Sequence, residues 1–123
     1  SETLLQFYPG SHEDIPAMAG QLLDLSRRGI SFHGVIAADD TLALAAVKYA
    51  RGKGYRIPED FSVLGYNNSM LAACCEPELT SIDNKLESLC QHLTSTLMGV
   101  LEGKEMPKKT IFSGEIIKRG TTR

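Results

Sequence analysis

Apolar and polar residues along the chain follow a pattern that predicts strands and helices in turn. Continuous apolar runs of strand length occur at 4–8, 34–38, 61–65, 79–82 and 111–117. Apolar residues at helical spacing occur at 13–28, 41–53 and 84–102, and a short helix is predicted at 70–75. A strand that is apolar throughout is typical of a parallel sheet with both faces covered. The order of segments therefore predicts an α/β fold.

The three long helices differ in how their apolar residues are arranged. The 13–28 helix carries one apolar face, made by Met18, Leu22, Leu23 and Leu25. The 41–53 helix is apolar on more than one side, so we expect it to contact a second surface besides its own sheet. The 84–102 helix is the clearest amphipathic segment. Its stripe consists of Leu86, Leu89, Cys90, Leu93, Leu97, Met98 and Leu101.

Two polar turns follow neighbouring predicted strands. Asp39 and Asp40 come directly after the 34–38 strand, and Asn67 and Asn68 follow the 61–65 strand. The carboxyl ends of parallel strands meet at one edge of a sheet, which is where open α/β sheets bind small molecules. The sequence has no phosphate loop and no evident nucleophile there. A binding site is the resulting interpretation.

Composition narrows the classes of protein to consider. The 123 residues suffice for one domain, and a net charge of −2 gives no basic face for nucleic acid. No apolar run reaches the roughly 20 residues of a membrane span. The three cysteines include the adjacent Cys74 and Cys75, a pattern that suggests neither a disulfide framework nor a zinc site. We therefore expect reduced thiols, a cytoplasmic protein, and no cofactor or metal.

Several short motifs occur together in an order typical of one family. The stretch IAADDTLALAAVKYARGKGYRIPEDFSVLGYNN, followed by PELTSID and then IIKRGTT, resembles the effector-binding core of LacI/GalR transcription regulators. The matching motifs span roughly 35–122. The resemblance implies a three-layer αβα lobe of the periplasmic-binding-protein-like fold, present as an incomplete fragment. Residues 1–123 would be the C-terminal part of the effector-binding domain, without a DNA-binding headpiece. They would form most of the second lobe, with 79–102 related to the segment that family members return to the first lobe.

The resemblance also implies effector-binding residues. Asp39 stands where the family commonly has Asn, and Asn67 stands where it commonly has Asp. One hypothesis is that the ligand-binding carboxylate has changed strands, from position 67 to position 39. The alternative is that Asp39 only caps the next helix and Asn67 only shapes a turn. Asp40 is expected to serve in capping and hinge geometry.

Further contacts are expected after the 79–82 strand and before the first long helix. Asn84 and Leu86 lie where relatives place polar and apolar contacts to the ligand, although they also suit a helix start and its core stripe. An aromatic stacking residue is expected at Tyr8 or His12. The implied partner is a small sugar or sugar phosphate, with operator DNA bound only through the missing headpiece and no membrane contact.

A homodimer surface is the last implication of the resemblance. The family pairs its second lobes where this chain has an extra apolar helix face and a short following turn. The expected residues are Leu44, Ala45, Val47, Lys48, Met70, Leu71 and Cys74. The alternative is that they pack within a single chain.

Three other classes of protein are alternatives to this interpretation. A periplasmic sugar-binding protein shares the two-lobe fold, and the full-length N-terminus would distinguish it by a signal peptide. A signalling receiver domain would need a third carboxylate and a late lysine that the pattern lacks. An enzyme would need Asp39, Asp40 and Asp60 to converge, yet Asp60 precedes a strand and so lies at the opposite edge.

Overall fold

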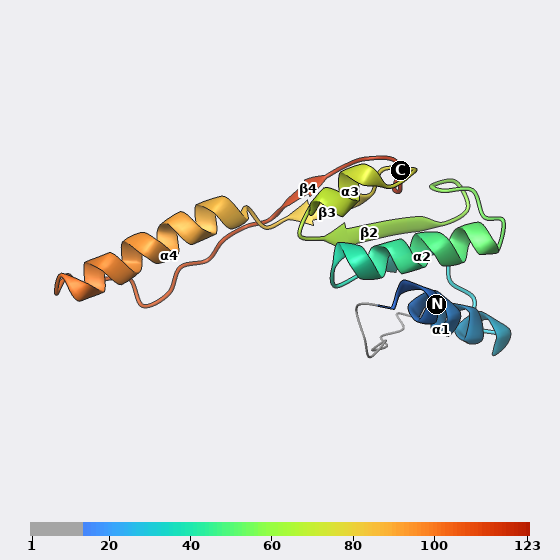
Figure 1. Cartoon of the computed structure of the whole chain (residues 1–123), viewed down its shortest axis with the longest axis horizontal. Helices are drawn as coiled ribbons and strands as arrows, with labels where there is room; N and C mark the ends of the chain where they lie inside the picture. The colour runs from blue at the N-terminus through green and yellow to red at the C-terminus, as the bar shows by residue number, and fades with distance from the viewer. Residues whose placement is uncertain (1–13) are drawn as a thin grey trace.

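The computed structural model describes residues 14–123, and Figure 1 shows how its elements are arranged. The helices are α1 (Ile15–Arg27), α2 (Asp40–Gly52), α3 (Met70–Cys74) and α4 (Leu86–Leu101). The strands are β1 (Gly34–Ile36), β2 (Ser62–Tyr66), β3 (Thr80–Asp83) and β4 (Glu115–Ile117). The strand expected at 4–8, with Tyr8 and His12, lies outside the described residues.

The four strands form one sheet in the order β1-β2-β3-β4. β1 pairs with β2, and β2 with β3, in parallel, whereas β4 runs antiparallel to β3. This arrangement confirms an α/β fold with a mostly parallel sheet. Because β1, β2 and β3 run in the same direction, their carboxyl ends lie at one edge, as the sequence predicts.

Helix α2 packs between the sheet and α1. It contacts β1 and β2 on one side and α1 on the other, and Figure 1 shows the order β2, α2, α1. Ala43, Ala46 and Ala50 of α2 are each 0% exposed. The small side chains allow close approach on both sides. The second apolar surface expected of this helix is therefore confirmed, and α1 is what it contacts.

The expectation that both faces of the sheet are covered is not met by the described residues. Helices α2 and α3 lie on the face that Val63 and Ser81 present, and α1 lies on α2 rather than on the sheet. Side chains alternate along a strand, so Ile36 points to the other face, where it is 76% exposed. Residues 14–123 thus supply two of the three predicted layers at β1.

The chain leaves this compact part after β3 and returns to it at β4. We call residues 84–114 the arm, and residues 14–83 with 115–123 the body. In Figure 1, α4 extends away from the sheet and the chain runs back alongside it. Phe112 contacts His92 with ring centroids 5.3 Å apart, and Met106 lies against Gly99. The strand predicted at 111–117 is correspondingly shorter, because its first half lies along α4.

The C-terminal residues join β2 to β3. Thr121 is 0% exposed, and its hydroxyl donates to the Val63 carbonyl (2.7 Å) while accepting from the Thr80 N–H (2.9 Å). The Val63 N–H in turn donates to the Thr121 carbonyl at 2.9 Å. Direct pairing of β2 with β3 begins only at Leu64 and Thr80. Thr121 therefore supplies the hydrogen bonds where the two strands are not yet paired.

Candidate functional site

The polar turns after β1 and β2 lie at the same edge of the sheet, and the turn after β3 joins them there. Asp39 follows β1, Asn67 follows β2 and Asn84 follows β3. β1 and β2 are paired as far as Ile36 and Leu64, and β2 and β3 as far as Tyr66 and Ile82. The parallel register therefore carries all three turns to the carboxyl edge.

Asp39 is the N-cap of α2. It has extended backbone geometry, and its carboxylate accepts a hydrogen bond from the Leu42 N–H at 2.7 Å. Such a bond satisfies one of the N–H groups that a helix start leaves free. Asp39 therefore caps the helix, which was the alternative to ligand binding at this position. Its contact with a ligand stays a prediction.

Asp40 does not cap the helix, contrary to its expected role. It is the first residue of α2, is 2% exposed, and holds α3 and β3 in place. Its carboxylate accepts from the Ser69 N–H at 2.6 Å, the Ser69 hydroxyl at 2.7 Å and the Ser81 hydroxyl at 2.6 Å. Three donors from two elements satisfy a carboxylate that would be costly to bury unpaired. A Cβ at Gly65 would overlap this carboxylate, so the position requires glycine.

Asn67 and Asn84 are brought together. The Asn84 side-chain N–H donates to the side-chain oxygen of Asn67 at 3.1 Å, across the gap between the two turns. Asn67 has a φ of 91° and Asn68 a φ of 46°, in the left-handed region that asparagine tolerates better than most residues. The paired asparagines after β2 thus form the tight turn that presents Asn67 to solvent.

An open hollow of about 770 Å³ lies beside this pair, and we call it the edge hollow. Leu86 lines the hollow and is 61% exposed, so its side chain offers an apolar surface to the hollow and is not part of the core. Asp39 is not among its lining residues. The full lining consists of Asn67, Asn68, Ser69, Asp83, Asn84, Lys85, Leu86, Glu87 and Ser88. Three of the four predicted effector residues therefore share one hollow, and Asp39 stands apart from them along the edge.

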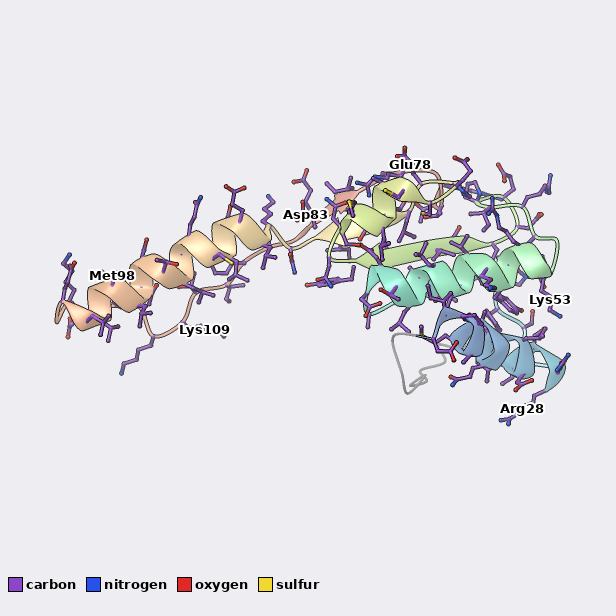
Figure 2. All side chains as sticks on the ribbon, viewed as in Figure 1. Arg28, Lys53, Glu78, Asp83, Met98 and Lys109 are labelled. Carbon is purple, nitrogen blue, oxygen red and sulfur yellow. The ribbon has the colours of Figure 1, made fainter. Side chains whose placement is uncertain are left out.

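The charged groups of the edge hollow are mostly acidic. Asp83 and Glu87 line it together with Lys85, whose ammonium group lies 3.5 Å from the Glu115 carboxylate. Figure 2 shows Asp83 at the junction between body and arm. The described side of the hollow thus offers amides, hydroxyls and carboxylates, which are suited to binding hydroxyl groups.

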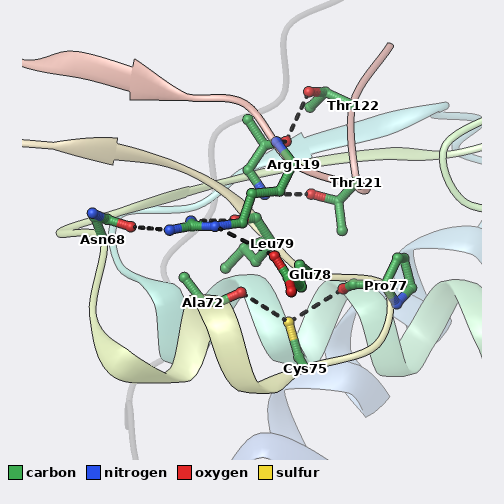
Figure 3. Close-up of polar contacts among 10 residues, drawn as sticks. Asn68, Ala72, Cys75, Pro77, Glu78, Leu79, Arg119, Thr121 and Thr122 are labelled. Atoms are coloured by element: carbon green, nitrogen blue, oxygen red, sulfur yellow. Dashed lines mark hydrogen bonds and ion pairs between the residues drawn. The ribbon is translucent and has the colours of Figure 1, made fainter.

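Arg119 is a residue that the sequence pattern did not single out for this site. Its guanidinium donates to the Asn68 side-chain oxygen at 2.7 Å and to the Leu79 carbonyl at 2.8 Å (Figure 3). The Asn68 side-chain N–H donates in turn to the Asp83 carboxylate at 3.2 Å. The only signal for this contact in the sequence is the KRGTT motif near the chain end, which gives no spatial partner.

The predicted dimer surface is only partly exposed. Ala45 and Val47 are 1% and 5% exposed, and Val47 belongs to the core between α2 and its neighbours. Packing within a single chain, the alternative given for this surface, accounts for the burial of these two residues, and their place in a dimer interface stays a prediction. The surface that remains consists of Leu44, Lys48, Met70, Leu71 and Cys74, of which Met70 is 80% exposed.

The cysteines are free thiols. Cys75 donates to the carbonyls of Pro77 and Ala72, with sulfur–oxygen distances of 3.3 and 3.6 Å (Figure 3). Burial raises the pKa of its thiol, which favours the unreactive protonated form. Among residues 14–123 there is no cluster of His, Cys, Asp or Glu that could hold a metal ion. No helix in this described part is long and apolar enough to cross a membrane.

The chain is similar to known proteins in both sequence and structure. Residues 9–122 match the family model of a periplasmic binding protein-like domain. An HTH-type transcriptional regulator of Lachnoclostridium phytofermentans is 43% identical over 121 residues, which are 98% of this chain and 35% of that protein. The lac repressor dimer bound to operator and the anti-inducer ONPF has a TM-score of 0.79 at 26% identity, over 86% of this chain and 37% of its own. The complex of the regulator CelR with cellobiose has a TM-score of 0.77 at 26% identity, over 89% and 34%. The chain spans about a third of the length of these proteins.

Proposed function

Because this chain belongs to the periplasmic-binding-protein-like family, as part of the effector-binding core of a LacI/GalR-type regulator, we propose that it senses a small sugar for a transcription regulator. The ligand binds at the carboxyl edge of the sheet, and no bond of the ligand is made or broken. The relatives are regulators rather than transport proteins, which favours this function over that of a periplasmic sugar-binding protein. The regulator acts in the cytoplasm.

The observation that carries the proposal is the pairing of Asn67 with Asn84 beside an open hollow. Each amide offers both donors and acceptors, and these match the hydroxyl groups of a sugar, which donate and accept in the same way. Leu86 supplies an apolar surface for the carbon face of the ring. Asp83 and Glu87 outnumber Lys85 on this side, so the described part of the site favours a neutral sugar over a sugar phosphate.

Asp39 has the second role in the proposal. Its carboxylate stands at the same edge as Asn67 while the family's usual residue types are exchanged between the two positions. A ligand that extends along the edge from the hollow would reach both. The hydrogen bond from the Leu42 N–H keeps this carboxylate oriented.

The arm supplies the link to a second lobe. In helix α4, Leu93, Leu97 and Leu101 are 56%, 60% and 72% exposed, and the helix makes no extensive contact with another helix or strand of residues 14–123. We assign residues 79–102, with their return, to the segment that packs on the first lobe in intact relatives. The edge hollow lies where body and arm meet, so a ligand there contacts both lobes and favours one relative arrangement of them. It does so only by its differential affinity for the two arrangements.

Two copies pair through the remaining exposed surface, and operator DNA is bound through a headpiece that is not in this chain. Leu44, Met70 and Leu71 form its apolar part, with Met70 80% and Leu71 42% exposed. Leu44→Glu should reduce the dimer mass in sedimentation of the intact regulator at low micromolar concentration, because it places a charge in an apolar interface. An unchanged dimer mass would remove this surface from the proposal.

A sugar panel on the intact regulator tests the binding function. Thermal shift with neutral sugars and sugar phosphates identifies the ligand, and calorimetry then compares variants. Asn67→Ala and Asn84→Ala should each weaken binding about tenfold, since each removes a hydrogen bond to the ligand. Asp39→Ala should weaken it by a similar factor.

A matched control is Gln91→Ala, which removes an exposed amide from α4 away from the edge hollow. It should leave the affinity unchanged. Equal affinities in the parent, Asn67→Ala and Asp39→Ala proteins would refute the assignment of the site, whatever sugar binds.

A further inference from the structure

The turn that presents Asn67 is held in an unfavourable backbone conformation. Asn67 and Asn68 have φ values of 91° and 46°, and two successive left-handed residues are disfavoured unless their surroundings fix them. Two hydrogen bonds that backbone N–H groups of the turn donate to β3 help to hold this conformation. The Asn67 N–H donates to the Ile82 carbonyl at 2.9 Å, and the Asn68 N–H donates to the Ser81 hydroxyl at 3.0 Å.

The side chain of Asn68 is held at both of its polar atoms. Its oxygen accepts from Arg119 at 2.7 Å, and its nitrogen donates to Asp83 at 3.2 Å. The Arg119 side chain is only 16% exposed, and its backbone N–H also donates to the Thr80 hydroxyl at 2.9 Å. Figure 3 shows the guanidinium lying between Asn68 and the start of β3. Arg119 does not line the edge hollow. Its contacts lead to the turn, not to the space for a ligand.

Asp83 connects the two turns that carry the proposed ligand contacts. One carboxylate oxygen accepts from Asn68, and the other accepts from the Lys85 N–H at 2.7 Å. Lys85 has a φ of 54°, so the turn after β3 is also in the left-handed region. A continuous chain of hydrogen bonds therefore runs from Arg119 through Asn68 and Asp83 to Lys85. It accompanies the Asn67–Asn84 pair without using either of these side chains.

We propose that Arg119 and Asn68 are positioning residues, which set the distance and orientation of Asn67 relative to Asn84 from the C-terminal segment of the chain. The inference rests on the proposed function for its importance. The contact itself exists without a ligand and can be tested without one. Asn67 and Asn84 contact the sugar. Asn68 also lines the edge hollow, but Arg119 and Asp83 engage both polar atoms of its side chain, so it acts through the turn, as Arg119 does.

A charge exchange tests the contact between Asn68 and Asp83. Asn68→Asp keeps an acceptor for Arg119 but places two carboxylates within hydrogen-bond distance with no donor between them, so their repulsion should open the turn on the Asp83 side. Adding Asp83→Asn restores a donor opposite an acceptor, and the oxygen of the new amide can still accept from the Lys85 N–H. A purely structural loss at position 68 would not be repaired by a second substitution at position 83.

The readout is hydrogen exchange of individual backbone N–H groups in the 123-residue chain, followed by NMR. Asn68→Asp should raise exchange at Asn67 and Asn68 about tenfold relative to Val63, a core reference, since only the turn opens. The double variant should return these rates to within about threefold of the parent. The side-chain amide signals of Asn67 and Asn84 should shift in the single variant and return in the double.

A second pair of variants keeps the test decisive if Asn68→Asp fails to fold. Arg119→Lys retains the charge but lacks the planar fork that reaches Asn68 and the Leu79 carbonyl together. It should raise exchange at Asn67 and Asn68 about threefold. Arg123→Lys is the matched control, because Arg123 belongs to the same segment but bonds the Glu59 carbonyl, away from the turn. It should change neither rate.

Two results would overturn the proposal. One is unchanged exchange at Asn67 and Asn68, relative to Val63, in Arg119→Lys. The other is a double variant whose turn stays as open as that of folded Asn68→Asp. Because no sugar is present, either failure is separate from a failure of the sugar panel, which concerns the ligand alone.

Discussion

Helices α2 and α4 have similarly apolar sequences but meet opposite surroundings in this chain. In α2, Ala43, Ala46 and Ala50 are 0% exposed, because α1 and the sheet cover the helix from two sides. In α4, the only buried residue is Gly99, and Leu97 is 60% exposed. A periodic pattern predicts that a helix forms and which face is apolar. It does not predict whether the surface that covers this face belongs to the same part of the chain.

The difference has energetic consequences. Full burial of a leucine side chain stabilises a protein by about 1.5–3 kcal/mol. Leu22 of α1 and Leu79, just before β3, make that contribution in the body, whereas the leucines of α4 do not in residues 14–123. A helix of 16 residues is marginally stable in water without packing. The order of the arm should therefore depend on a covering surface, while the body is stabilised by its own core.

The sharpest test compares one leucine from each region. Leu22 of α1 is 3% exposed, and Leu22→Ala should lower the free energy of unfolding by about 2–5 kcal/mol through lost burial and the resulting cavity. Leu97 of α4 is 60% exposed, and Leu97→Ala should change it by less than about 0.5 kcal/mol. Urea unfolding of the 123-residue chain measures both. Similar losses would mean that the arm is covered in solution, and the comparison would no longer hold.

A second test concerns Thr121, which connects β2 to β3 after the chain has returned from the arm to the body. Thr121→Val keeps the shape of the side chain but removes the hydroxyl that serves the Val63 carbonyl and the Thr80 N–H. Each buried group left unpaired costs about 1–3 kcal/mol, so a total loss of about 2–6 kcal/mol is expected in urea unfolding.

Its control is Thr122→Val in the same segment. Thr122 donates only to the Thr80 hydroxyl and is half-buried. The loss should stay below about 1 kcal/mol, the typical net contribution of one hydrogen bond. Equal losses in the two variants would argue against the specific role of Thr121 between β2 and β3.

The sequence predicted most elements of this fold for identifiable reasons. Buried strands and capped helices have strong local signals, so α1, α2 and β2 lie within two residues of their expected ends. The error at 111–117 has a physical cause. Ile111 and Phe112 are as apolar as a strand requires, but they lie along the arm, where Phe112 contacts His92. Local composition cannot distinguish these two environments.

The sequence predicted less of the candidate site than of the fold. The edge of the sheet follows from strand order, so Asp39 and Asn67 were predicted to lie at the same edge. Asn84 was expected at the site only from the family resemblance, and its hydrogen bond to Asn67 was not predicted. The roles of Asp39 and Asp40 could not be separated, because two adjacent acids are equally good caps by sequence. Arg119 was missed since its partner Asn68 is 51 residues away along the chain. Long-range side-chain contacts have no periodic signal.

A third test addresses the close packing that makes the body rigid at the site. Gly65→Ala would drive a methyl group into the Asp40 carboxylate and the Leu79 side chain. The expected loss is about 1–3 kcal/mol in unfolding free energy, typical of overpacking. Gly52→Ala is the control, because a Cβ at Gly52 meets no atom within 4 Å. It should leave stability unchanged or raise it by up to about 1 kcal/mol. If Gly65→Ala does not lower the free energy of unfolding, the body is loosely packed at this edge and the contrast with the arm does not hold there.

The smallest expected effect lies at the opposite edge of the body, where polar groups face solvent. Arg56 donates to the Asp60 carboxylate through its guanidinium at 2.8 Å and through its backbone N–H at 3.0 Å. These bonds lower the pKa of Asp60 to about 2 from an ordinary value of 3.8. Because the folded-state pKa is depressed, the resulting stability is present above about pH 4 and is lost as the pH falls through about 2. The pair is exposed, so solvent screening keeps the effect small.

Two variants test this interaction, one at the donor and one at the acceptor. Arg56→Gln removes the guanidinium but keeps the backbone N–H, so the pKa of Asp60 should rise to a value between about 2 and 3.8 in an NMR titration of its carboxyl carbon. Asp60→Asn should remove the corresponding change in the urea midpoint between about pH 4 and pH 2. An Asp60 that titrates at its ordinary value in the parent chain would show that this turn is open in solution. The boundary between ordered body and exposed arm would then have to be drawn inside the body, at residues 56–60.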